Sequence, residues 1–256
     1  MMSFFYKLNP ILQSFIAAMI TFLITALGSA CIFLTKNISK KYMDIMLSVS
    51  AGIMLASAFF SLLNPAIINA ENLNMTPWIV CTIGLLLGLL ILYLGDIYNR
   101  KKASKSINNL ILSMTLHNIP EGMAIGVAFG SITYGLTSSS VMSAISLAIG
   151  IGIQNFPEGS AISFPLYREG YSKKKAFLIG ALSASVEPIG AIFGALLVMK
   201  VRFIMPYLLA FAAGAMLYVI ATELIPESMN NEKKELMALY FGIGFIIMMI
   251  LDISLG

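Results

Sequence analysis

The sequence predicts an all-α membrane protein that crosses the bilayer eight times, and three observations carry this prediction. Hydrophobic residues make up 59% of the 256 residues, charged residues only 11%, and the mean hydropathy is +0.90. Soluble domains carry about 25% charged residues, so this composition excludes a water-soluble globule. The apolar residues also form continuous runs instead of alternating with polar ones, which favours helices over the strands of a membrane barrel.

Eight apolar runs of spanning length follow one another along the chain, with short polar breaks between them. About 20 apolar residues in a helix cross the roughly 30 Å of hydrocarbon in a bilayer. The predicted spans are residues 11–35, 45–68, 78–95, 107–129, 141–166, 176–199, 203–225 and 236–251. Little remains for a soluble domain, so residues 1–256 are predicted to form a single transmembrane domain. The N-terminal segment lacks the basic region and cleavage site of a signal peptide, so the first run is predicted to be a retained helix.

The basic residues predict the orientation of these spans. Lys7, Lys200 and Arg202 fall on one side of the membrane, and the other thirteen basic residues fall on the opposite side. Those thirteen are Lys36, Lys40, Lys41, Arg100, Lys101, Lys102, Lys105, Arg168, Lys173, Lys174, Lys175, Lys233 and Lys234. Basic loops stay in the cytoplasm, so both termini are predicted to be extracytoplasmic. The same bias accounts for the net charge of +4 without a nucleic-acid partner.

Two internal repeats relate spans that run in opposite directions. Residues 117–126, HNIPEGMAIG, and 154–163, QNFPEGSAIS, share six of ten positions at an offset of 37. A fainter repeat at an offset of 162 matches AGIML at 51–55 with AGAML at 213–217, and Gly28 with Gly190. Inverted repeats around two proline-interrupted helices are typical of a secondary transporter with a site at the bilayer midplane.

Three carboxylates, Glu121, Glu158 and Glu187, fall near the middle of their spans. Each costs about 2.5–3.5 kcal/mol at the bilayer centre on insertion scales. No basic residue lies at the centre of a span to pair with them. Protonation, an aqueous cavity or a bound cation could each accommodate the charge.

Helix geometry favours the cation. At 100° per residue, Glu121 lies angularly between His117 and Asn118, one turn further along the helix. The fifth span repeats this geometry with Gln154, Asn155 and Glu158. Nitrogen and oxygen donors without a thiolate suit Zn²⁺, Mn²⁺, Fe²⁺ or Cd²⁺. A single polar residue in a membrane helix is often only an interhelical hydrogen bond, but the duplicated set favours a metal site.

These motifs resemble the ZIP (Zrt-, Irt-like protein) family of divalent-metal transporters. The resemblance rests on HNIPEG, QNFPEG and Glu187, together with AGIMLASAFFSLLNPA in the second span and AGAMLYVIATELIPE in the seventh, so it covers essentially the whole chain. In having glutamine at position 154, the chain resembles the GufA-type bacterial branch of the family. The resemblance implies eight helices in a 3+2+3 inverted-repeat ZIP fold with both termini extracytoplasmic, and a homodimer.

The resemblance also implies a two-metal centre in which Glu121 and Glu158 bridge both ions. If the family's ligand positions apply to this chain, the first ion is bound by His117, Glu121, Gln154 and Glu158. The second is bound by Asn118, Glu121, Asn155, Glu158 and Glu187.

Two departures from the family pattern qualify this expectation. Many members have histidine where this chain has Gln154, and a weaker amide ligand is expected to loosen the preference for Zn²⁺. The loop at 99–106 contains no histidine, so it does not support a cytosolic metal-sensing loop.

Glu223 fits either a relay ligand on the exit path or a carboxylate that reaches water at the membrane surface.

The predicted function is transport of Zn²⁺, with Cd²⁺, Mn²⁺ and Fe²⁺ as further substrates, into the cytoplasm by alternating access. No cofactor and no enzymatic activity are predicted. The expected location is a cell membrane, as a multi-pass protein of a prokaryote. Two alternatives stay open: an intramembrane metalloenzyme, since His117 and Glu121 share a helix face, and a proton-coupled carrier of a non-metal substrate.

Overall fold

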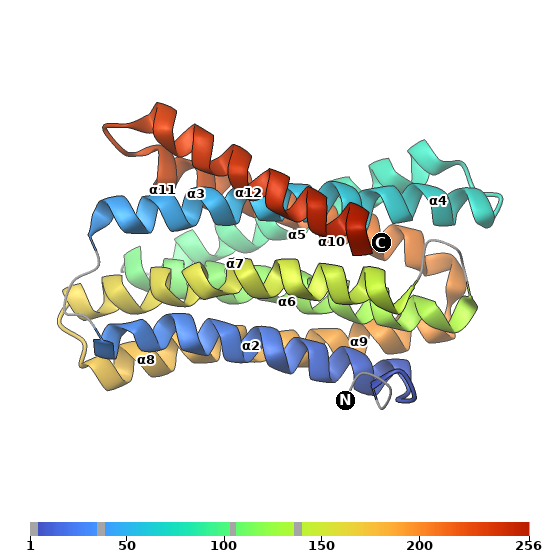
Figure 1. Cartoon of the computed structure of the whole chain (residues 1–256), viewed down its shortest axis with the longest axis horizontal. Helices are drawn as coiled ribbons and strands as arrows, with labels where there is room; N and C mark the ends of the chain where they lie inside the picture. The colour runs from blue at the N-terminus through green and yellow to red at the C-terminus, as the bar shows by residue number, and fades with distance from the viewer. Residues whose placement is uncertain (1–4, 35–38, 103–105, 136–139, 256) are drawn as a thin grey trace.

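The computed structural model describes residues 5–34, 39–102, 106–135 and 140–255, and throughout these ranges it contains helices and no strand. Six helical stretches are long and apolar enough to cross a membrane: Pro10–Leu34, Lys40–Asn72, Pro77–Tyr98, Lys173–Lys200, Arg202–Met229 and Lys234–Ser254. Figure 1 shows the long helices running along one common axis. The prediction of an all-α, multi-pass membrane protein is therefore confirmed.

The helices coincide closely with the apolar runs of the sequence. They are α2 (Pro10–Leu34), α3 (Lys40–Ala56), α4 (Asn64–Asn72), α5 (Pro77–Lys102), α6 (Ser106–Ser131), α7 (Val141–Arg168), α8 (Lys173–Leu182), α9 (Val186–Lys200), α10 (Met205–Val219), α11 (Ile225–Met229) and α12 (Lys234–Leu255). Helices α6 and α7 are not among the six apolar stretches, and each carries the amides and carboxylates of the duplicated motif at its centre.

Three of the spans predicted as continuous helices change their winding on the way. A π-helical segment, η1 (Ser57–Leu63), joins α3 to α4, and a second, η5 (Ile220–Leu224), joins α10 to α11. These two segments lie at equivalent positions, because an offset of 162 places residues 58–62 on 220–224. A short 3₁₀ turn, η3 (Ser183–Ser185), separates α8 from α9 just before Glu187. Such local changes in winding are frequent at functional sites.

Helices α6 and α7 lie in the middle of the molecule. In Figure 1, α2, α8 and α9 lie on one side of them, and α3, α4, α10 and α12 lie on the other. The most extensive contacts join α2 to α7, α6 to α9, α3 to α12 and α5 to α10. Exchanging each helix for its repeat partner converts the first contact into the second and the third into the fourth. The packing therefore follows the inverted repeat seen in the sequence.

Glycines allow the central helices to approach their neighbours closely. A Cβ atom on Gly122 of α6 would lie 2.2 Å from the backbone oxygen of Glu187, and one on Gly159 of α7 would lie 2.0 Å from that of Thr25. Small residues permit such backbone contact between membrane helices. The two contacts are equivalent by the offsets of 37 and 162, so the same device anchors both halves.

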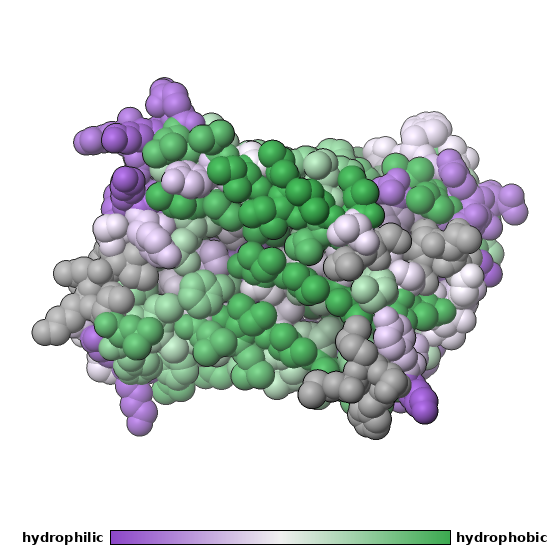
Figure 2. Space-filling view, viewed as in Figure 1, coloured by the Kyte–Doolittle hydropathy of each residue, from purple (hydrophilic) through white to green (hydrophobic). Residues whose placement is uncertain are grey.

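The visible side of the molecule is mostly apolar and its two ends are more polar. Figure 2 shows hydrophobic residues across the middle of the visible face and hydrophilic residues gathered at the ends. Helices α3, α8 and α12 begin at one end, where Lys40, Lys173 and Lys234 are their first residues. Helix α2 begins, and α12 ends, at the opposite end (Figure 1).

Candidate metal centre

The site forms where α6, α7 and α9 meet, and it brings together six of the seven residues predicted from the sequence. The side chains of all six are buried: Asn118, Glu121, Gln154, Asn155, Glu158 and Glu187. Helices α6 and α7 continue through Pro120 and Pro157. The backbone of the seventh residue, His117, lies in α6, and its side chain is outside the described residues.

Two neighbouring amides on α7 reach two different carboxylates. Gln154 Nε2 donates a hydrogen bond to Glu121 Oε1 at 2.7 Å, which joins α7 to α6. Asn155 Nδ2 donates to Glu187 Oε1 at 2.8 Å, which joins α7 to α9. Successive residues of a helix point about 100° apart, so one helix can serve two adjoining positions.

The third amide of the site, on Asn118, connects α6 to the segment before α9. Asn118 Nδ2 donates to the backbone oxygen of Ser183 at 3.0 Å. Ser183 begins the 3₁₀ turn that precedes Glu187. This bond therefore ties α6 to the segment that positions the third carboxylate.

The three carboxylates are close enough for their charges to repel one another. The charges of Glu158 and Glu187 each repel the charge of Glu121, and the charge of Glu158 repels that of Glu187. Among the residues whose burial is described, no lysine or arginine is buried. Buried charges require a partner of opposite sign or a metal ion. The electrostatics of the site therefore favour a cation.

Four buried oxygen atoms at the site accept no hydrogen bond from any described residue. They are Glu121 Oε2, Asn118 Oδ1, Gln154 Oε1 and Asn155 Oδ1. Leaving a buried acceptor unsatisfied costs about 1–3 kcal/mol. Carboxylate and amide oxygens are ligands for divalent cations, so a bound ion would satisfy the same atoms that the described residues leave without a donor.

Two carboxylates of the site bond to amide nitrogens. Within the described part of the chain, no three His, Cys, Asp or Glu side chains are arranged to hold a metal. The amide nitrogens of Gln154 and Asn155 bond to the carboxylates instead. Direct coordination would require these amides to turn so that they present oxygen in place of nitrogen.

The sequence analysis missed one side chain at the site, Thr21 of α2. Its Oγ1 donates to Glu187 Oε2 at 2.5 Å, and the side chain is buried. Two signals could have found it. Thr21 is a polar residue inside an apolar run. At the offset of 162 it is also the repeat equivalent of Ser183, and Ser183 precedes Glu187 by four residues.

Three further carboxylates, Asp96, Asp252 and Glu223, lie outside this site. Asp252 Oδ1 accepts a hydrogen bond from Ser61 Oγ at 2.6 Å, and both residues line a cavity of about 300 Å³ near the end of α12. Tyr218 donates to Asp96 Oδ2 at 2.8 Å. Glu223 lies in η5 and is half-buried.

The fold and the site together define a multi-pass membrane protein with a buried cluster of carboxylates and amides. Residues 99–252 match the sequence profile of the family described as ZIP Zinc transporter. The chain belongs to this family, which is one of transporters and not of enzymes.

Three relatives show how far the similarity extends. Zinc transporter ZIP11 of Xenopus tropicalis is 34% identical, over 97% of this chain and 98% of its own. Zinc transporter GufA of Myxococcus xanthus is 33% identical, over 94% of this chain and 98% of its own. Zinc transporter ZIPB of Bordetella bronchiseptica is 32% identical, over 92% and 79%. The bacterial relatives agree with the expected prokaryotic origin.

Proposed function

We propose that this protein transports divalent metal ions, Zn²⁺ among them, into the cytoplasm through the site between α6, α7 and α9. The observation that carries the proposal is the group of buried carboxylates beside four oxygen atoms that accept no hydrogen bond from any described residue. Zn²⁺ is the named substrate of the relatives, and no cofactor is required. Cd²⁺, Mn²⁺ and Fe²⁺ are further substrates because the donor set has no thiolate and Gln154 replaces an imidazole.

The site holds two ions side by side. His117, Glu121, Gln154 and Glu158 bind the first. Asn118, Glu121, Asn155, Glu158 and Glu187 bind the second, and Glu121 and Glu158 bridge the two. The separate bonds from Gln154 to Glu121 and from Asn155 to Glu187 support two adjoining positions.

Metal entry exchanges one kind of carboxylate partner for another. Without an ion, the N–H groups of Gln154 and Asn155 donate to Glu121 and Glu187 and offset part of the repulsion between the carboxylates. An arriving cation replaces these donors, and each amide then turns its oxygen toward the ion. The protein–protein hydrogen bonds lost on loading are regained on release, which keeps binding reversible.

The chain forms one transmembrane domain over residues 1–256, with eight spans in a 3+2+3 inverted repeat and both termini extracytoplasmic. Helix α2 begins and α12 ends at one end of the molecule, as an even number of crossings requires (Figure 1). The lysine-bearing starts of α3, α8 and α12 lie at the other end, which the positive-inside rule assigns to the cytoplasm. The family resemblance further implies a homodimer, which light scattering of the purified protein in detergent would test.

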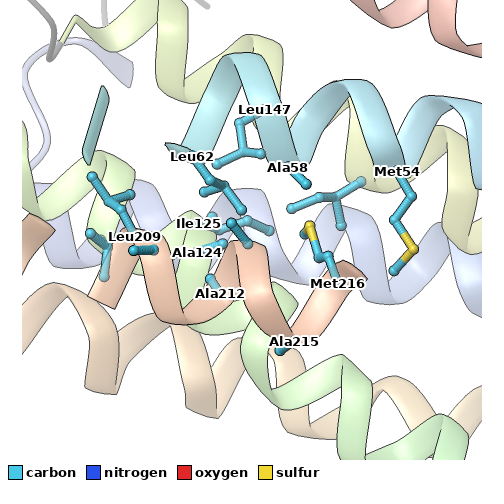
Figure 3. Packing of buried hydrophobic residues seen from close by; sticks show 14 of the residues in the cluster. Met54, Ala58, Leu62, Ala124, Ile125, Leu147, Leu209, Ala212, Ala215 and Met216 are labelled. Carbon is cyan, nitrogen blue, oxygen red and sulfur yellow. The ribbon is translucent and has the colours of Figure 1, made fainter. Parts of the chain in front are cut away.

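Alternating access requires a barrier on each side of the site in turn. Figure 3 shows a cluster of buried apolar side chains where α3, α6, α7 and α10 meet, with Leu62, Ile125 and Leu147 among them. Leu147 also lines the cavity that contains Asp252, so the cluster and the cavity adjoin. Ala128, another lining residue, is seven residues beyond Glu121 on α6, or about 10 Å along the helix. We assign the cluster as the outer barrier and the cavity as the space outside it.

Metal flux into proteoliposomes tests this function. Purified wild-type protein is expected to give saturable Zn²⁺ uptake, and Glu121→Ala and Glu158→Ala are each expected to abolish it. Glu235→Ala, an exposed glutamate in the first turn of α12, serves as the control and keeps full activity. Unchanged flux in both site variants would refute the proposal.

A further inference from the structure

Thr21 contacts the site from α2, a helix that contributes none of the predicted metal ligands. Its side chain is 1% exposed, and its Oγ1 lies 2.5 Å from Glu187 Oε2. The other oxygen of this carboxylate, Oε1, accepts the hydrogen bond from Asn155 at 2.8 Å. Each oxygen of Glu187 therefore has one donor, and the two donors come from different helices.

The Thr21 hydroxyl has a second acceptor within reach. Its Oγ1 lies 3.0 Å from the backbone oxygen of Ala18, one turn earlier in the same helix. A hydroxyl carries one proton and two lone pairs, so it can donate to Glu187 or to Ala18 but not to both at full strength. Rotation about the Cβ–Oγ bond exchanges the two without moving the helix.

We propose that Thr21 is a positioning residue of the metal site and that its hydroxyl has two orientations. When the site is empty, the proton points to Glu187 and holds this carboxylate in place. When a divalent cation occupies Glu187, the hydroxyl donates to Ala18 instead, and its oxygen faces the cation. This inference rests on the proposed function, because it requires a cation at Glu187.

The chemistry of the two orientations matches the needs of the two states. A buried carboxylate without a cation needs hydrogen-bond donors, and Thr21 and Asn155 supply one to each oxygen. A cation at the same carboxylate would repel a hydroxyl proton and attract its lone pairs. Because Ala18 offers an acceptor for the displaced proton, the Thr21 hydroxyl keeps a hydrogen bond in both states.

Thr25 provides a matched control one turn further along α2. It is the same residue type and is also 1% exposed, but its hydroxyl donates to the backbone oxygen of Thr21 at 3.2 Å. Replacing Thr25 by valine therefore removes a buried threonine hydroxyl from the same helix without touching Glu187.

The test measures the Zn²⁺ dissociation constant of the full-length protein in detergent by titration calorimetry. Thr21→Val is expected to weaken binding about tenfold, because the bound cation loses the hydroxyl oxygen that faces it. Thr21→Ser keeps the hydroxyl and is expected to stay within about twofold of wild type, as is Thr25→Val. Thr21→Ala repeats the loss of the hydroxyl with a smaller side chain, in case valine disturbs folding.

A second measurement separates positioning from a general effect on packing. In a Glu187→Gln background, Thr21→Val is expected to weaken binding by no more than about twofold, because without this carboxylate the cation is no longer held against the Thr21 hydroxyl. Unchanged affinity in Thr21→Val, failure of serine to preserve binding, or an equal loss in both backgrounds would overturn the inference. Wild-type binding that is lost in Glu121→Ala would leave the proposed function intact in each of these cases. Absence of Zn²⁺ binding by the wild type would instead overturn both.

Discussion

The first and sixth spans occupy equivalent places in the inverted repeat but bring different chemistry to the site. At the offset of 162, Thr25 is the repeat equivalent of Glu187, and Thr21 is the repeat equivalent of Ser183. The backbones of Thr25 and Glu187 pack in the same way, each against a glycine of a central helix. Only the sixth span carries a carboxylate at this position. The repeat therefore determines how the helices pack, while single substitutions within it decide where the charge lies.

The largest expected effect comes from removing this difference with Glu187→Thr. The variant makes the sixth span resemble the first and removes a residue that we propose binds the second ion only. We expect bound Zn²⁺ to fall from two ions per chain to one, and Zn²⁺ flux to fall by at least about tenfold. Equilibrium dialysis with elemental analysis gives the stoichiometry. Two bound ions with wild-type flux would show that the asymmetry has no role in binding.

The packing itself is tested by adding a methyl group at the two equivalent glycines. Gly122→Ala and Gly159→Ala would each place a Cβ within 2.2 Å of a backbone oxygen, which forces the helices apart. Overpacking of this kind costs about 1–3 kcal/mol, and we expect similar losses for both variants in thermal unfolding.

Gly242→Ala is the control for these variants, since no atom lies within 4 Å of the added Cβ. A loss of stability in only one of the two central variants would contradict the equivalence of the halves.

A smaller effect is expected from the one ligand position at which the two central motifs differ. Gln154→His gives the motif of α7 the same first residue as the motif of α6, which begins with His117. Imidazole suits Zn²⁺ better than an amide oxygen does, so we expect the preference for Zn²⁺ over Mn²⁺ to rise about fivefold in a competition binding assay. An unchanged ratio would mean that residue 154 does not contact the ion.

Comparison of the helices with the sequence shows which features were predictable. The apolar runs located every long helix, because hydrophobic length is a local property of the chain. The duplicated motif located the buried polar cluster, since carboxylates and amides inside apolar runs have few structural roles. The π-helical segments Ser57–Leu63 and Ile220–Leu224 were not predicted, because a change in winding has no compositional signal of its own.

The partners of the site residues were less predictable than their identities. Angular spacing grouped Glu121 with His117 and Asn118 on its own helix. In the structure Glu121 accepts a hydrogen bond from Gln154 on the neighbouring helix, 33 positions away. Helical periodicity gives the direction of a side chain around its own axis. It does not give the rotation and height of the helix that faces it.

The sequence by itself determined that this chain is a helical membrane protein of the ZIP family, and which carboxylates and amides lie inside it. Those properties follow from composition, periodicity and a repeated motif. Only the tertiary structure decided that Thr21 holds Glu187, a pair separated by 166 positions in the chain. A threonine in an apolar run can satisfy its hydroxyl within its own helix, as Thr25 does. Its real partner is settled by the packing of α2 against α7 and α9, where close contact brings one hydroxyl to a buried carboxylate.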